Sequence, residues 1–264
     1  MNIIVCVKAA PDMESHFKIK SNNLEIDDEN LVYKMNAFDE CAVEEALKIK
    51  EKNGGEVIIV SLGSEKTMQV MRKAFAMGGD RGVLLSDPVF EGSDSMTTAR
   101  LLRKAIGEIS FDLILTGVQA EDDANAQVGP ALAELLNIPH ATVVTKLEVS
   151  QDGKKTTVHR ELEGGTLEVV ELSFPCLLTI QTGINIPRYP SLPGIMKAKK
   201  KEIKELKLSD TGFSANEVGK NASRVKRLSL FHQEEKSHAE ILQGDASQVA
   251  NQLIAKLKER KVFN

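Results

Sequence analysis

A chain of 264 residues can bury one large core or two smaller ones, and 42% hydrophobic with 27% charged residues is typical of an ordinary globular protein. The net charge of −4 gives no electrostatic footprint for nucleic acid, and 4% aromatic residues leave little material for stacking bases. Three cysteines without a Cys-x-x-Cys pair and five scattered histidines predict neither a disulfide framework nor a metal site.

The N-terminal residues do not resemble a targeting segment. Met1–Val7 is strand-like from the start and has no basic region followed by a cleavable end. No apolar run approaches the length that a membrane span requires. We therefore expect a cytoplasmic prokaryotic protein that does not itself span a membrane.

The first half of the chain alternates apolar runs with amphipathic segments. Short apolar runs, typical of buried parallel strands, occupy residues 3–7, 56–62, 83–85 and 112–116. Helical periodicity is found in residues 36–53, 65–77, 94–109 and 128–136. Asn36 or Asp39 is expected to cap the first helix, and residues 8–31 are expected to form a loop or hairpin excursion. The alternation predicts an α/β, doubly wound, mostly parallel sheet.

After Pro139 the pattern changes to β-branched runs. These runs, 141–149, 155–162 and 166–174, are separated by turns at Gln151–Gly153 and Glu163–Gly165. Such turns are hairpin signals, so an antiparallel β-hairpin region over residues 141–180 is appended to the sheet. Within it, Cys176–Ile180 is expected to rejoin the main sheet as a buried strand. Residues 1–187 would then form the α/β domain.

The stretch Gly117–Ala133 is a strand-to-helix turn at the carboxyl end of a predicted strand, where open α/β sheets bind ligands. Its small and amide-bearing residues allow backbone N–H groups to approach an anion at a helix N-terminus. Asp122 and Asp123 are candidates for the helix cap and for a contact to a ribose hydroxyl. An ordinary capped turn explains the same residues, so both interpretations remain open at this level.

Residues 184–202 contain three prolines within seven positions, which predicts no regular structure. Apolar Leu192, Ile195 and Met196 lie beside a cluster of lysines. A solvated basic helix end and an exposed docking arm are both compatible with this pattern. Farther on, residues 209–238 are expected to form an extended tail outside the core. A last amphipathic helix over 244–260, capped by Asp245, would bury its apolar stripe elsewhere, with a partner subunit as one candidate.

Three stretches together resemble the β (small) subunit of an electron-transferring flavoprotein. Val158–Thr179 matches the family signature in its basic residue, its acidic-Gly-Gly turn and its closing Pro-x-aliphatic-aliphatic-Thr. Pro187–Lys201 is similar to the partner-recognition loop of the family, and Gly117–Ala133 has its Gln-Ala-x-Asp start and Gln-x-Gly end. The resemblance extends from residue 1 to about residue 205.

The resemblance implies a heterodimer with an α subunit that holds the electron-transferring FAD. The β subunit would hold a structural AMP, or a second FAD in members that bifurcate electrons from NADH. The nucleotide contacts that the resemblance implies are Cys6, Asn36, Ala37, Phe38, Asp39, Leu62, Asp122, Asp123, Ala124, Asn125, Ala126, Gln127, Val128, Gly129, Pro130, Ala131, Leu132 and Ala133.

The same resemblance implies a protruding recognition loop over 188–205, with Leu192 as the hydrophobic anchor that enters a partner dehydrogenase of the acyl-CoA dehydrogenase type. The loop residues expected to recognise partners are Arg188, Tyr189, Leu192, Pro193, Ile195, Met196, Lys197 and Lys200. Arg160 and Glu161 would steer the α-subunit flavin domain. Residues 206–264 would form a C-terminal arm and terminal helix that pack on the α subunit. A membrane-bound quinone reductase is a candidate acceptor.

One departure from the family bears on the nucleotide. Many bifurcating members have Asp-Gly-Asp-Thr where this chain has Asp122–Asn125, which favours AMP over a second FAD. Ala126–Pro130 is closer to the bifurcating sequence and keeps FAD open. No nucleophile–base pair is apparent, so we expect an electron carrier and not a catalyst. The alternatives are an NADH-oxidising bifurcating subunit and a stand-alone adenine-nucleotide-binding protein.

Overall fold

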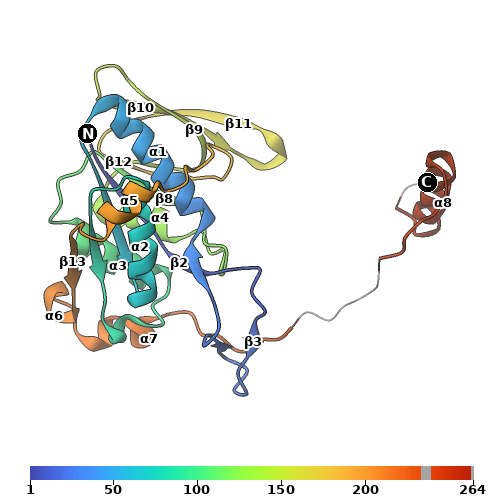
Figure 1. The fold of residues 1–264 in the computed structure, drawn as a ribbon, viewed down its shortest axis with the longest axis horizontal. Coiled ribbons are helices and arrows are strands. Elements are labelled where there is room, and N and C mark those ends of the chain that lie inside the picture. The colour runs from blue at the N-terminus through green and yellow to red at the C-terminus, as the bar shows by residue number, and fades with distance from the viewer. Residues whose placement is uncertain (233–238, 263–264) are drawn as a thin grey trace.

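The computed structural model describes residues 1–232 and 239–262, which form a central sheet covered by helices (Figure 1). In order across this nine-stranded sheet of the described residues, the strands are β11 (Leu167–Ser173), β10 (Lys155–Glu161), β9 (His140–Val149), β12 (Cys176–Ile180), β8 (Leu113–Gly117), β1 (Asn2–Cys6), β6 (Glu56–Leu62), β7 (Arg81–Leu85) and β13 (Ile203–Leu206).

The sheet is mostly parallel, as the sequence predicts. All pairs from β9 through β12, β8, β1, β6 and β7 to β13 run parallel. The hairpin strands β10 and β11 pair antiparallel with β9 and with each other. The predicted fold class is therefore confirmed, including the return of Cys176–Ile180 to the main sheet.

Both faces of the sheet are covered because successive strand residues point to opposite sides. Ile3 and Val5 belong to one core cluster, which also holds buried residues of α1 (Ala37–Asn53) and α2 (Glu65–Met77). Ile4 belongs to the other, with α3 (Ser95–Ile106) and α4 (Val128–Leu136). This arrangement explains why the strands have continuous apolar runs with no polar alternation.

The polar excursion after β1 forms two small antiparallel sheets, as the hairpin prediction suggested. One pairs β2 (Ala9–Pro11) with β5 (Tyr33–Met35), and the other pairs β3 (Lys18–Ile19) with β4 (Ile26–Asp27). The first brings the chain from the end of β1 directly to the start of α1.

The prediction of no regular structure over 184–202 is wrong in part. Residues Leu192–Ala198 form a short helix, α5. Ser191 caps it by accepting a hydrogen bond from the backbone N–H of Gly194, and Pro193 lies in the first turn. A proline there removes an N–H group that has no partner within the helix, so it favours the helix start.

The prediction of an extended tail from residue 209 is also wrong for its first part. After β13, the chain forms α6 (Leu208–Thr211), the 3-10 turn η3 (Ala215–Glu217) and α7 (Gly219–Ala222). Val218 is 1% exposed and belongs to the α3–α4 core cluster, beside the turn η1 (Pro88–Phe90). These pieces are too short to show periodicity in the sequence. Part of the predicted tail, residues 233–238, lies outside the described residues.

The terminal helix α8 (Ala246–Glu259) has the predicted cap, since Asp245 accepts a hydrogen bond from Gln248 N. None of its residues is buried, and Figure 1 shows it standing apart from the sheet. Leu253 and Ile254 are each almost half exposed. In the part of the chain that the structure describes, no helix combines the length and the apolar character needed to cross a membrane.

The packing of residue 218 can be tested by truncation. We expect Val218→Ala to lower the free energy of unfolding by about 1 to 3 kcal/mol, because it leaves a cavity in a filled core. Val225→Ala, at a position that is 74% exposed, removes the same atoms without a cavity and serves as the control. Denaturant unfolding of both variants measures the difference, and equal effects would contradict the assignment of residues 209–222 to the core.

Candidate functional site

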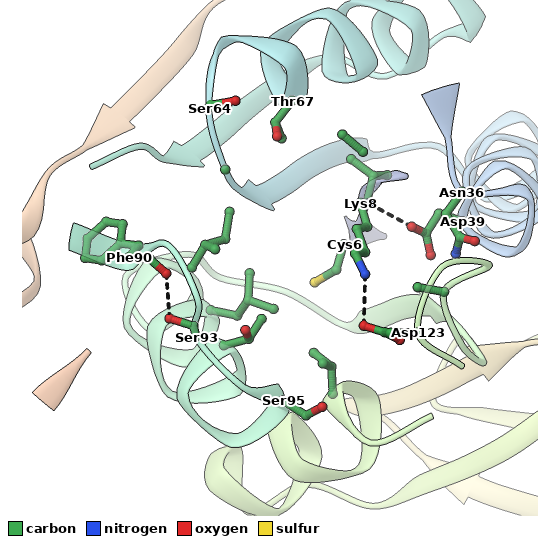
Figure 2. Close-up of a pocket in the computed structure, with 18 of the residues that line it drawn as sticks. Cys6, Lys8, Asn36, Asp39, Ser64, Thr67, Phe90, Ser93, Ser95 and Asp123 are labelled. Carbon is green, nitrogen blue, oxygen red and sulfur yellow. Dashed lines mark hydrogen bonds and ion pairs between the residues drawn. The ribbon is translucent and has the colours of Figure 1, made fainter. Parts of the chain in front are cut away.

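A cavity of about 920 Å³ lies at the carboxyl ends of the parallel strands. Residues at or just beyond the ends of β1, β6, β7 and β8 line it, and Figure 2 shows several of these side chains pointing into it. Strand β1 has β6 as its neighbour on one side and β8 on the other, so the chain leaves β1 and β8 in opposite directions along the sheet. This is a topological switch point, where open α/β sheets bind ligands.

The N-terminal residues of three helices line the same cavity, and they differ in their capping. The carboxylate of Asp94 caps α3 by accepting a hydrogen bond from Thr97 N at 2.8 Å. Helices α2 and α4 have no side-chain cap. In α4, Pro130 contributes no N–H group, and the first two residues of the helix, Val128 and Gly129, line the cavity. Uncapped N–H groups and the helix dipole together favour an anion here.

The loop before α4 is held in an unusual backbone conformation. Ala124 and Ala126 have φ values of 50° and 54°, a left-handed region that costs a residue with a Cβ on the order of 1 kcal/mol. Ala126 is followed by Gln127 in the right-handed helical region. A left-handed residue next to a right-handed one turns successive N–H groups toward the same side, the geometry of an anion-binding nest.

The start of α1 ties the ends of β1 and β8 together below the cavity. The carboxylate of Asp39 accepts hydrogen bonds from Lys8 N at 2.7 Å and from Gly117 N at 2.9 Å. The side chain of Asn36 donates to Gln119 O at 2.8 Å and accepts from Glu121 N at 3.1 Å. Burial raises the pKa of Asp39 to about 7, against the opposite effect of these N–H donors and of the Lys8 charge.

Lys8 connects the end of β1 to the loop before α4. Its ammonium group lies 2.6 Å from a carboxylate oxygen of Asp122 and 3.0 Å from one of Asp123 (Figure 2 shows the latter pair). Burial acts to lower the pKa of Lys8, but the two carboxylates outweigh it and the pKa is raised. The lysine therefore stays charged and offsets the acidic residues beside the anion-binding backbone.

Gly129 has a packing role that its place in the loop did not reveal. A Cβ at this position would lie 2.6 Å from the Thr179 methyl carbon and 2.9 Å from the Thr116 hydroxyl. Only glycine lets the first turn of α4 approach β8 and β12 this closely. The residue places the uncapped helix start at the mouth of the switch point.

The ionisable groups of the cavity suit binding better than bond-making chemistry. Burial raises the pKa of the Cys6 thiol to about 12, with the Asp39 charge adding to the effect, so it is not a reactive thiolate. No group of histidine, cysteine and acidic side chains in residues 1–232 and 239–262 has metal-binding geometry. The cavity thus offers backbone donors, the side chains of Lys8, Lys66 and Lys207, and apolar walls, a combination suited to a nucleotide.

Comparisons with known proteins agree on one family. The model of the electron transfer flavoprotein domain matches residues 23–211. The chain is 40% identical to electron transfer flavoprotein subunit beta of Methylophilus methylotrophus, with 99% of each chain covered. It is 38% identical to the protein of that name in Bacillus subtilis, and 37% identical to the caffeyl-CoA reductase-Etf complex subunit CarD of Acetobacterium woodii, with all of each chain covered.

The chain belongs to the electron transfer flavoprotein family.

Part of the nucleotide set implied by the family resemblance lines the cavity of this electron transfer flavoprotein chain. The lining members are Cys6, Asn36, Asp39, Leu62, Asp123, Asn125, Ala126, Gln127, Val128 and Gly129. The members that do not line it are Ala37, Phe38, Asp122, Ala124, Pro130, Ala131, Leu132 and Ala133. Leu132 and Ala133 are fully buried, on the side of α4 that packs into the core. The expectation that Asp122 or Asp123 caps α4 is wrong, since Gln127 occupies that position.

Sequence reasoning missed the side of the cavity formed by α2 and α3. The lining residues there include Gly63, Ser64, Thr67, Phe90, Ser93, Asp94, Ser95 and Thr98, together with Lys207 from the segment after β13. Serine and threonine at helix starts are common caps, so this pattern alone does not distinguish a ligand site from an ordinary turn. The signal that could have found them was the placement of three strand-to-helix turns on one edge of a parallel sheet.

The predicted docking and steering residues lie away from this cavity. Tyr189, Leu192 and Met196 are 96%, 79% and 73% exposed, respectively. Arg160 pairs with Glu168 across the hairpin at 3.0 Å, and Glu161 ends β10 on the exposed side. Arg188, in contrast, is engaged with Glu44 and Glu51 of α1.

The pKa of Asp39 makes stability depend on pH. Its folded-state pKa of about 7 lies above the unfolded value of about 3.9, so the folded state binds the proton more tightly. The stability gained from this proton is complete below the unfolded pKa and is lost as pH rises through the folded pKa. Between pH 6 and pH 8, Asp39 should lower the free energy of unfolding by about 1.4 kcal/mol.

Denaturant unfolding gives the free energy of unfolding of the wild type and of Asp39→Asn at both pH values. The difference between the two proteins should change by this amount from pH 6 to pH 8. Asp28→Asn is the control, because its ion pair with Lys66 lowers the pKa of that carboxyl and it stays ionised throughout. A stability difference between the wild type and Asp39→Asn that is the same at both pH values would contradict the titration of Asp39.

Proposed function

We propose that this chain is the β subunit of a heterodimeric electron transfer flavoprotein, which holds a structural AMP in the switch-point cavity and docks partner dehydrogenases through the loop around α5. The observation that carries the proposal is the uncapped start of α4, with its strained preceding loop, facing a cavity at the carboxyl edge of the sheet. The family membership supports it.

AMP fits the chemistry of this cavity. The N–H groups of Val128 and Gly129 and the backbone around Ala126 suit the phosphate, which carries the negative charge that a helix N-terminus favours. Apolar side chains such as Val7 and Leu62 line the inner wall and suit the adenine ring. Bound AMP would join the ends of β1 and β8 to α4 and so stiffen the edge of the sheet.

The loop around α5 has the properties of a docking surface for a transient redox partner. Ile186, Tyr189, Leu192 and Met196 are large apolar side chains that are 91%, 96%, 79% and 73% exposed. Exposed lysines at 197, 199 and 200 follow them. One apolar anchor with a basic rim suits the small interfaces of electron-transfer complexes, and acidic partners would be steered to it. The partners we propose are acyl-CoA dehydrogenase-type flavoenzymes.

The α subunit would cover the remaining exposed apolar residues. Val225, Leu228 and Phe231 of the arm are 74%, 82% and 82% exposed, and α8 buries none of its residues. Large apolar surfaces of this kind mark protein contacts. FAD held by the α subunit would supply the electron transfer itself. Arg160 and Glu161, at the end of the hairpin, would orient the flavin domain, and the electrons would pass on to a quinone reductase.

A bifurcating subunit with a second FAD is the alternative that a specific observation favours. The cavity continues beyond the α4 loop to the starts of α2 and α3, so it has room beyond the phosphate site. The 37% identity to the CarD subunit of a caffeyl-CoA reductase-Etf complex is consistent with this candidate. Membership of this family weighs against the third possibility, a stand-alone adenine-nucleotide-binding protein.

The nucleotide content distinguishes the two candidates. We expect the purified αβ complex, once denatured, to release one FAD and one AMP per heterodimer, measured by chromatography of the extract against protein concentration. Release of two FAD molecules and no AMP would contradict the electron-carrier function and support the bifurcating subunit instead. Release of neither AMP nor a second FAD would contradict the proposal that this cavity holds a nucleotide.

Docking by Leu192 can be tested with a single truncation. We expect Leu192→Ala to raise the KM for the complex as electron acceptor of an acyl-CoA dehydrogenase at least about tenfold, because a central apolar anchor contributes on the order of 2 kcal/mol. Leu24→Ala, the same change at an exposed position in the β3–β4 turn, should leave the KM unchanged. Equal rates for wild type and Leu192→Ala would remove the docking role, provided that both complexes hold the same amount of flavin.

A further inference from the structure

The docking loop is attached to the body of the protein at both ends. At its first end, Arg188 reaches α1 and bonds both carboxylate oxygens of Glu44, at 2.8 and 3.1 Å. The backbone N–H of Arg188 donates to the same carboxylate at 3.1 Å, and the remaining side-chain bonds go to Glu51. Glu44 is 4% exposed, so this is a desolvated, charge-assisted contact.

The second end is attached to α2. One Arg72 nitrogen donates to the backbone oxygens of Ala198 at 2.7 Å and of Lys201 at 2.6 Å, which lie at the end of α5 and just beyond it. The ammonium group of Lys201 donates in return to carbonyl oxygens at the end of α2, those of Phe75 and Gly79. One carbonyl in the last turn of each helix, that of Ala198 in α5 and that of Phe75 in α2, therefore has a cationic partner, as the helix dipole favours.

Between the two ends, α5 lies directly against α2. A Cβ at position 194 would collide with the backbone oxygen of Ala76, so the approach requires glycine at this position. On the opposite side, Leu192 and Met196 remain 79% and 73% exposed. The helix is thus fixed on one face and presents apolar side chains on the other.

We propose that Arg72 and Arg188 are positioning residues that hold α5 in the orientation required for docking, an inference that rests on the proposed docking function. A free loop would lose conformational entropy on binding, and each immobilised side chain and backbone segment would weaken the complex. A loop that is already fixed avoids this cost. Arg188 would then not touch the partner, because its guanidinium is hydrogen-bonded to Glu44 and Glu51 of α1.

Loss of a positioning residue and loss of a contact residue should have different effects on hydrogen exchange. Loss of a positioning residue weakens binding of the partner but leaves the bound complex unchanged, so KM should rise while kcat stays constant. It should also raise hydrogen exchange of the backbone over residues 188–201 in the αβ complex alone. Loss of a contact residue such as Leu192 should raise KM without changing that exchange.

The test uses the αβ complex with Arg72→Gln and with the pair Glu44→Gln and Arg188→Gln. The double change is needed because Arg188→Gln alone leaves a buried carboxylate without its partner and can unfold the chain. Lys73→Gln is the matched control for Arg72→Gln. It removes one positive charge from the next residue of α2, whose ion pair is with Glu40 of α1.

We expect about a tenfold rise in KM for an acyl-CoA dehydrogenase with both test variants, faster hydrogen exchange over 188–201, and no change in kcat or flavin content. Arg72→Lys, which restores the charge and one donor group, should recover part of the loss. Lys73→Gln should behave as wild type. Faster exchange with an unchanged KM would overturn the inference, as would a KM that rises equally in Lys73→Gln.

Failure of the docking function itself gives a different result. If Leu192→Ala also leaves the KM unchanged, the loop does not dock this partner and the proposed function fails. If Leu192→Ala raises the KM but neither Arg72→Gln nor the Glu44→Gln and Arg188→Gln pair does, docking stands and only the positioning role is overturned.

Discussion

The contact on which the site depends is the buried carboxylate of Asp39, which accepts one N–H from the chain leaving β1 and one from the end of β8. These two strands run side by side at the switch point, and their chains diverge directly afterwards. Asp39, in the first turn of α1, thus joins the two chain segments at the ends of β1 and β8 and holds this part of the cavity wall in place. Asn36 extends this contact to the loop before α4. The two hydrogen bonds to this shared carboxylate are strong because the site is buried, and water cannot replace the carboxylate as the acceptor for either N–H group.

The strands and long helices were predictable because their signals are local and strong. Ile3–Val7 and Val57–Val60 are continuous apolar runs, and α2 was predicted with its correct ends. The segment after β13 was not predictable, since Val218 is a single buried apolar residue among polar neighbours. Its packing is decided by η1, which is distant in sequence. The helix α5 was missed because three prolines, at 187, 190 and 193, together suggest irregular structure. Pro193, however, lies in the first turn of α5, where proline is favourable.

The candidate site was predictable on one side only. The loop before α4 has a recognisable composition, and its place after β8 made it a candidate for ligand binding. Ser64, Ser93 and the other residues at or before the starts of α2 and α3 have side chains that many helix starts share, and only the assembled sheet brings them to one cavity. Gly129 was named for binding, whereas the Thr116 and Thr179 side chains show that close packing already requires it. Function and packing coincide there because a helix start must approach the sheet before its N–H groups can face a ligand.

The two regions of the proposed function, the cavity and the loop around α5, share the same pair of helices. The first turn of α1 carries Asn36 and Asp39 beneath the cavity, and its later turns carry Glu44 and Glu51, which hold Arg188. The start of α2 lines the cavity, and farther along α2 Arg72 holds the end of α5. If the cavity holds the proposed nucleotide, binding that stiffens the starts of α1 and α2 would also stiffen the helices that support the proposed docking loop. The proposed AMP would then have a physical role without reacting, since α5 can be presented rigidly to a partner only if the helices that support it are themselves fixed.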